Sequence, residues 1–413
     1  MNHAARLNDW LQRMPPAEPV VVHELLALSA CEWRRFTEQY PAPLRMDLTR
    51  NIIERAHLLL SRTPKDAVPT SRLAVLLAKS LAGVFADPAS CDAAIDLEGD
   101  AWREEAHALL TVSDYDRARE AAEEAAFLYR LRSDERIPND DGSLLSLILF
   151  QMVSGDLNEG TLERLERAAV LGLITGQILH GQGELADGLL LVEQSCNVLL
   201  SCCDQKGKYV QGRTIYAKML AEQRSYTEAL EVFERTAAVA RELGDNETLA
   251  HLVNNIGYCY YHFLGNVIKA KECLQLAAQM FDDLGLAAEA LRPRNELASL
   301  LIEEGRYSTA VSELYKSRQA YLDAGLLNEA AQVMLRIIRA LVLAGRQADI
   351  NWTEMESVLG RGGLRREAMR ALQHLHRLAS LRALNTGDME DAEAMLLNLG
   401  SGGPENALPA EAG

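Results

Sequence analysis

The chain has 413 residues, of which 48% are hydrophobic and 24% charged, and its formal net charge is −17. This composition is typical of a folded protein and excludes a largely disordered one. The negative charge repels phosphate groups and argues against generic nucleic-acid binding. Aromatic residues make up only 6%, and the helix-forming residues Ala, Leu, Glu and Arg dominate, which favours an all-α fold.

The sequence carries no pattern for export or membrane insertion. The N-terminal stretch holds no apolar segment of signal-peptide length, and no run approaches the roughly 18 apolar residues of a membrane-spanning helix. The 7 cysteines include no Cys-x-x-Cys pair, which is typical of reduced thiols. We therefore expect a cytoplasmic protein that does not act at a membrane.

Residues 1–43 are expected to form short helices separated and closed by pairs of prolines. A helix-turn-helix can be drawn over residues 21–40. Its second helix is short, however, and carries Glu32 and Glu38, which suit DNA poorly. We therefore interpret this block as an N-terminal cap for the helices that follow.

Residues 44–184 are expected to form degenerate helix pairs. Apolar residues recur at helical spacing between residues 44 and 62, and Pro64 begins the next helix at a position that proline favours. The segment Pro138–Gly142 contains the densest turn signals and is the best candidate for an internal joint.

A repeat becomes measurable within residues 185–345. In each copy a small residue follows a Tyr or an apolar residue by three positions, and these small residues are Gly188, Ala229, Ala270 and Ala310. Their spacings are 41, 41 and 40 residues. Glycines that end helices have nearly the same period, at Gly244, Gly285 and Gly325. A fixed period of this length indicates stacked helix pairs.

Residues 346–399 are expected to form capping helices, and residues 400–413 a disordered tail. The segment 361–382 is basic, since Glu367 is its single acid among several arginines and histidines. This segment can cap the repeats, fold back onto the acidic body, or bind an acidic partner or a membrane surface. Capping is the preferred interpretation because terminal repeats need a polar outer face.

The repeat resembles the tetratricopeptide repeat (TPR) family. The matching residues are Ala217, Leu220, Tyr226, Ala229 and Phe233 in one copy, Gly257, Tyr260, Gly265 and Ala270 in the next, and Ala298, Leu301, Gly305, Tyr307 and Ala310 in a third. The period of about 40 exceeds the family norm of about 34. In this respect the chain is similar to the long-helix TPRs of kinesin light chains and of bacterial regulators of the Rap and MalT kind.

The resemblance implies an all-α, right-handed TPR-like α-solenoid of antiparallel helix pairs, whose first helices line a concave groove for a peptide or a protein segment. The family pattern places the following residues on the inner face: Gln211, Thr214, Lys218, His251, Asn254, Tyr258, Tyr261, Arg292, Asn295, Ser299 and Arg339. Asparagine amides can hold a ligand backbone, since they both donate and accept, and arginines can pair with carboxylates. The alternative is an ordinary wet helix face.

The sequence lacks the motifs of common enzymes and metal sites. There is no phosphate-binding glycine loop, no nucleophile elbow and no His-Glu-x-x-His. His374 and His376 point about 200° apart on a helix, which does not suit a shared metal ion. We therefore expect no catalytic residues, no metal and no cofactor.

These observations predict a non-enzymatic TPR adaptor or regulatory protein that binds a peptide or protein segment in its groove. Two alternatives stay open. One is a structural scaffold that self-associates as a homo-oligomer, and the other is a regulator of a transcription or signalling partner that acts through the N-terminal helices. Direct contact with nucleic acid or a membrane is not expected.

Overall fold

The computed structural model describes residues 20–38, 42–131, 159–201, 203–323, 326–346 and 349–353. Within these ranges the regular elements are fifteen α-helices, and no strand occurs. The predicted all-α, TPR-like fold of consecutive helix pairs is confirmed, because most helices pack against the next one in the chain. Two compact units make up the chain, unit 1 with residues 1–219 and unit 2 with residues 220–413.

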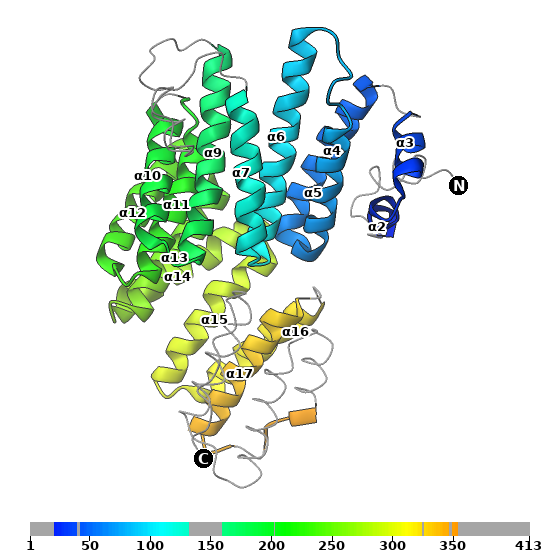
Figure 1. Cartoon of the computed structure of the whole chain (residues 1–413). Helices are drawn as coiled ribbons and strands as arrows, with labels where there is room; N and C mark the ends of the chain where they lie inside the picture. The colour runs from blue at the N-terminus through cyan, green and yellow to red at the C-terminus, as the bar shows by residue number, and fades with distance from the viewer. Residues whose placement is uncertain are drawn as a thin grey trace, which may run out of the picture. The chain divides into compact units, whose positions relative to one another are not determined.

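Unit 1 contains α2 to α10 and most of α11, and Figure 1 shows α4 to α7 and α9 running side by side. The bounds are α2 (Val20–Leu26), α3 (Ala30–Glu38), α4 (Ala42–Arg62), α5 (Pro64–Lys79), α6 (Pro88–Thr111), α7 (Tyr115–Leu131), α9 (Glu159–Gly181), α10 (Leu185–Ser201) and α11 (Lys206–Glu222). Pro64 and Pro88 begin their helices, where a missing N–H costs nothing. Asp87 caps α6 by accepting a hydrogen bond from the Ser90 amide at 2.8 Å.

Unit 2 is the more regular of the two. The bounds of its helices are α12 (Tyr226–Leu243), α13 (Asn246–His262), α14 (Val267–Asp283), α15 (Ala287–Glu303), α16 (Tyr307–Asp323) and α17 (Leu327–Leu343). The helices α13 to α17 have 17 residues each. A glycine with positive φ follows the C-terminus of several of these helices. These glycines are Gly244, Gly265, Gly285, Gly305 and Gly345. The left-handed conformation satisfies the last carbonyls of a helix and lets the chain reverse within a few residues.

Small residues set the distance between paired helices. Ala229, Ala270 and Ala310 are completely buried, at the repeat positions that the sequence predicts. Gly257, in the middle of α13, also allows close packing, because a Cβ atom added there would lie 2.9 Å from Cγ of Leu274 on α14. The repeat therefore works by close approach of helix backbones.

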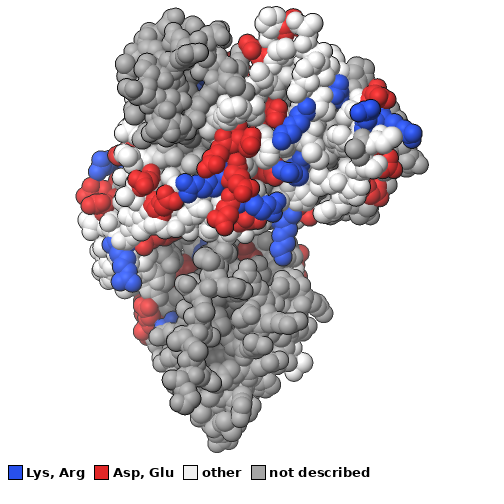
Figure 2. Space-filling view, in the orientation of Figure 1, with Lys and Arg blue, Asp and Glu red and all other residues white. Residues whose placement is uncertain are grey.

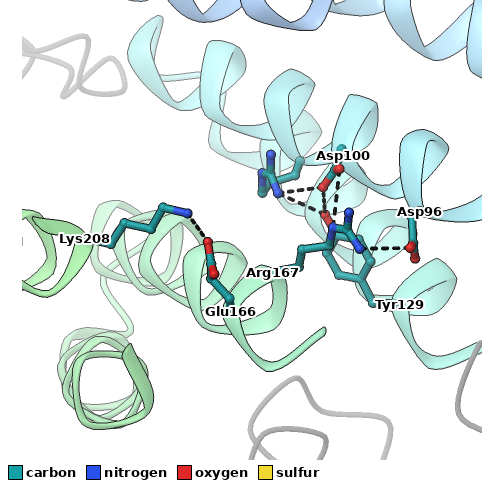
Figure 3. Close-up of polar contacts among 7 residues, drawn as sticks. Asp96, Asp100, Tyr129, Glu166, Arg167 and Lys208 are labelled. Carbon is teal, nitrogen blue, oxygen red and sulfur yellow. Dashed lines mark hydrogen bonds and ion pairs between the residues drawn. The ribbon is translucent and has the colours of Figure 1, made fainter. Parts of the chain in front are cut away.

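A buried polar network joins three helices of unit 1, as Figure 3 shows. Tyr129 on α7 donates its hydroxyl to Asp100 on α6 at 2.8 Å, and Arg103 donates to the same carboxylate at 2.7 Å. Arg167 on α9 donates to Asp96 at 2.8 Å. These bonds satisfy polar groups inside the helix layer, and they fix how α6, α7 and α9 meet.

Several sequence predictions lie outside the described residues. These are the first proline-bounded helix, the joint at 138–142, the basic segment 361–382 and the tail at 400–413, and the predicted domain boundaries stay predictions. Among the described helices, none has the length and hydropathy needed to cross a membrane.

Candidate binding site

A cavity of about 600 Å³ opens on unit 2, a volume in the usual range of ligand pockets of about 300–1,000 Å³. Its lining comes mainly from α13, α15 and α17, with one residue from α16. The lining residues are Asn254, Tyr258, Tyr261, His262, Arg292, Asn295, Glu296, Ser299, Tyr321, Glu329, Gln332, Val333, Arg336 and Arg339. The alternate helices of the repeat thus build one surface.

Helical spacing explains why each helix contributes a group of residues. On α13, Asn254, Tyr258 and Tyr261 follow one another by four and three positions and so share one face. The same reasoning applies to Arg292, Asn295 and Ser299 on α15 and to the lining residues of α17. Equal helix lengths and short turns then bring these three faces to one cavity.

Two asparagine side chains lining the cavity hold amide oxygens that lack a partner. The Oδ1 atoms of Asn254 and Asn295 are buried and accept no hydrogen bond within the described part of the chain. Asn295 is only 6% exposed, and its Nδ2 lies 3.4 Å from the Tyr321 hydroxyl, a long hydrogen bond. A buried acceptor without a donor costs roughly 1–3 kcal/mol, so such atoms call for an explanation.

Glu296 forms a charged centre in the lining. Its carboxylate accepts from Arg336 Nη2 at 2.7 Å and lies 2.9 Å from His262 Nε2. Burial alone would raise the pKa of Glu296, but Arg336 and His262 outweigh burial and lower the pKa to about 2. Glu296 is therefore an anion at neutral pH, and the Arg336 guanidinium balances its charge.

Aromatic side chains give the cavity an apolar wall. The Tyr258 ring is 4.1 Å from the His262 ring, centroid to centroid, and Tyr258 is 41% exposed. The Tyr261 hydroxyl donates to Glu303 at 2.6 Å, and burial together with Glu303 raises the pKa of Tyr261. Tyr261 therefore stays a neutral hydroxyl that can pack against a ligand.

The structure brings together seven of the eleven residues predicted for the groove: Asn254, Tyr258, Tyr261, Arg292, Asn295, Ser299 and Arg339. His251 lies on the same helix as Asn254, but its ring packs against Phe281, with centroids 4.8 Å apart. Gln211, Thr214 and Lys218 lie on α11 in unit 1. Their part in a groove stays a prediction.

Sequence reasoning missed other lining residues, among them Glu296, Tyr321, Glu329, Val333 and Arg336. Glu296 and Arg336 are separated by 40 residues (336 − 296), one repeat period. An acidic and a basic residue separated by one repeat period is the sequence signal that could have pointed to the contact between Glu296 and Arg336.

A second cavity, of about 660 Å³, lies in unit 1. Its lining combines Trp102 and Phe127 with acidic residues such as Glu120 and Glu124. Figure 2 shows acidic side chains gathered on the face where α7 lies. This surface differs from the cavity in unit 2, where arginines outnumber acids.

No protein-family model matches the chain, and no curated protein is significantly similar in sequence. Solved structures with a similar fold include apo RapI, with 14% identity, a TM-score of 0.48 and coverage of 85% of this chain and 97% of that one. A Rap protein in complex with competence and sporulation factor has 14% identity, a TM-score of 0.45 and coverage of 86% and 98%. Aspartyl phosphate phosphatase F from Bacillus subtilis has 11% identity, a TM-score of 0.46 and coverage of 87% and 96%. These similarities concern the fold alone.

Proposed function

We propose that the cavity of unit 2 binds an extended segment of a peptide or protein, and that the chain acts as a non-catalytic adaptor or regulator. The observation that carries this proposal is the pair of buried, unpartnered amide oxygens of Asn254 and Asn295 in one cavity. An extended ligand presents backbone N–H groups at regular intervals, and each can donate to one of these oxygens once rotation of the amide turns it toward the cavity. Binding would then satisfy two groups that the described residues leave unsatisfied.

The charges of the lining favour an acidic ligand. Among the lining residues, Arg292, Arg336 and Arg339 stand against Glu296 and Glu329, a balance of +1 (3 − 2) in a chain of net charge −17, while Arg292 also lies 3.4 Å from Glu289 outside the lining. Arginine pairs with carboxylates through two parallel hydrogen bonds, and such pairs are among the strong ones. We therefore expect the bound segment to carry an acidic side chain or its own C-terminal carboxylate.

The state of Glu296 supports binding rather than catalysis. A general base works best when its pKa lies near the operating pH. The pKa of Glu296 is lowered to about 2, and its two oxygens are held by Arg336 and His262. Glu296 therefore orients Arg336 and His262 within the lining.

The test uses the full chain and a phage-displayed library of random short peptides. Peptides selected on the wild type are then measured by fluorescence polarisation against a triple variant with Asn254→Ala, Asn295→Ala and Arg292→Glu. We expect this variant to bind at least about tenfold more weakly, because it loses two acceptors and one cation.

A matched control carries Asn197→Ala, Asn246→Ala and Arg294→Glu, three exposed positions outside the cavity with the same changes in composition and charge. This control should bind like the wild type. Selected peptides that bind the triple variant and the wild type equally would contradict the proposal, and so would the absence of any selected peptide.

A further inference from the structure

Three potential metal ligands converge in unit 1, far along the sequence from the cavity of unit 2. They are His57 on α4 and Glu104 and His107 on α6, and each offers one ligand atom within 4.8 Å of the other two. His57 Nδ1 lies 3.1 Å from Glu104 Oε1, and the two imidazole centroids are 6.0 Å apart.

The positions of these residues follow from the packing of the helices. Glu104 and His107 are three positions apart on α6 and therefore share one face. Helix α4 packs against α6 and brings His57 to that face. The Glu104 side chain is only 5% exposed, whereas the His57 side chain is 65% exposed. The Glu104 carboxylate thus forms the buried inner end of the cluster, and the His57 side faces solvent.

We propose that His57, Glu104 and His107 form a binding site for a divalent transition-metal ion of the zinc type. Two imidazoles and one carboxylate are a ligand set that binds zinc and similar ions, with a further position left to water. An ion pair between His57 and Glu104 accounts for two members of the cluster and gives His107 no role. A shared ion accounts for all three.

The geometry requires only a small closure. Zinc lies about 2.0–2.1 Å from nitrogen and oxygen ligands, so tetrahedral ligand atoms are roughly 3.3 Å apart. The pair His57–Glu104 already has this spacing, at 3.1 Å. The other two separations, both to His107, are at most 4.8 Å and can close by small side-chain adjustments of His107 and the exposed His57.

The charge around the cluster also permits a cation. Arg103 is the next residue to Glu104 in the chain, and its guanidinium is bound to Asp100 at 2.7 Å. The buried carboxylate of Glu104 therefore supplies negative charge that a bound ion would use. A bound ion would also join α4 to α6 directly, across residues that are 47 and 50 positions apart (104 − 57 and 107 − 57).

The experiment titrates the full, reduced chain with Zn²⁺ by calorimetry and with Co²⁺ by absorption spectroscopy. We expect one saturable ion that depends on the cluster and a Co²⁺ spectrum without thiolate charge-transfer bands. His107→Gln removes a direct ligand, so the affinity should fall by at least the roughly 10- to 100-fold that loss of an outer partner causes. His23→Gln, an exposed histidine on α2, is the control and should bind like the wild type.

His57→Gln repeats the test at an exposed position where folding is not at risk, and circular dichroism checks the fold of every variant. Equal Zn²⁺ affinity of the wild type and both cluster variants would overturn the proposal. The absence of saturable binding to the wild type, or a Co²⁺ spectrum dominated by thiolate bands, would overturn it as well.

Discussion

Arg224 occupies a turn position that glycine takes in the helix pairs that follow. Its φ of 64° lies in the left-handed region, close to the 62° of Gly265 and the 73° of Gly305. Residues with a Cβ atom adopt this conformation at a cost of roughly 1–2 kcal/mol, because Cβ approaches the following carbonyl. Arg224 is exposed, so little burial of its side chain offsets this cost.

Arg224→Gly is therefore expected to stabilise the chain by about 0.5–1 kcal/mol, since relief of strain exceeds the entropy that glycine loses on folding. Urea unfolding followed by circular dichroism measures the change. The reverse substitution, Gly305→Ala, places a Cβ at φ 73° and should destabilise by about 1 kcal/mol. An Arg224→Gly variant that is less stable than the wild type would show that the strain argument is wrong.

Glu296 makes the stability of the fold depend on pH. Its pKa is lowered from 4.5 to about 2, mainly by Arg336 and His262 acting against burial. The carboxylate pairs therefore contribute stability above about pH 4.5, and this contribution is lost as the pH falls towards 2. Its size at neutral pH is on the order of 3 kcal/mol.

Glu296→Gln should reduce the free energy of unfolding at pH 7 by about 3 kcal/mol, because Arg336 loses its buried partner. The difference from the wild type should shrink steadily between pH 4.5 and pH 2. Urea midpoints at pH 7, 5 and 3 test this. Glu313→Gln on the exposed face of α16 is the control. A difference that stays constant down to pH 3 would contradict the assignment.

At the scale of the element, the contact between α13 and α14 depends on Gly257. The Cβ of an alanine there would lie 2.9 Å from Leu274 Cγ and 3.2 Å from Cys273 Cβ, well inside ordinary contact distance. Alanine favours a helix over glycine by up to about 1 kcal/mol, but overpacking costs about 1–3 kcal/mol. The cost of overpacking at Gly257 therefore exceeds the gain in helix propensity.

Gly257→Ala is thus expected to lower stability by about 1–2 kcal/mol despite its better helix propensity. Gly207→Ala on α11 meets no atom within 4 Å and should be neutral or stabilising. Thermal unfolding of the two variants compares the effect of the same Gly→Ala substitution on stability at the closely packed Gly257 and at the open Gly207. Equal effects would mean that the helices separate without cost.

Sequence alone gives the elements well because their determinants are local. The period of the small residues, the turn glycines and the faces of α13 and α15 follow from spacing along the chain. The contacts that side chains make between helices do not follow from this spacing. Arg336 reaches Glu296 from the next repeat, and Tyr321 reaches Asn295 from α16. These contacts depend on how one helix is rotated against another, which a period does not specify.

The cluster of His57, Glu104 and His107 was missed for a related reason. It lies where the repeat is degenerate, and its histidines are 50 positions apart (107 − 57). No fixed spacing links a residue of α4 to a residue of α6 in that region. The absence of adjacent-ligand motifs such as His-Glu-x-x-His therefore excludes only sites built on a single helix.

At the scale of the whole molecule, each compact unit carries one proposed site. Hydrogen exchange separates the two proposals. A selected peptide should slow exchange in α13, α15 and α17, and Zn²⁺ should slow exchange in α4 and α6, because a ligand protects the helices that it holds. Peptide-induced protection confined to unit 1 would contradict the proposed function, while leaving the metal site to be judged by the Zn²⁺ arm.

The equal lengths of α13 to α17 have a consequence for the size of the segment that the proposed site would bind. Each of these helices is about 25 Å long, and every second one adds a strip of side chains to the lining. Duplication of one helix pair would add one more row of lining side chains, and the helices already present would keep the same face toward the cavity. If the cavity binds a segment as proposed, gene duplication would change the length of that segment most readily, and substitutions on the lining helices would change its chemistry.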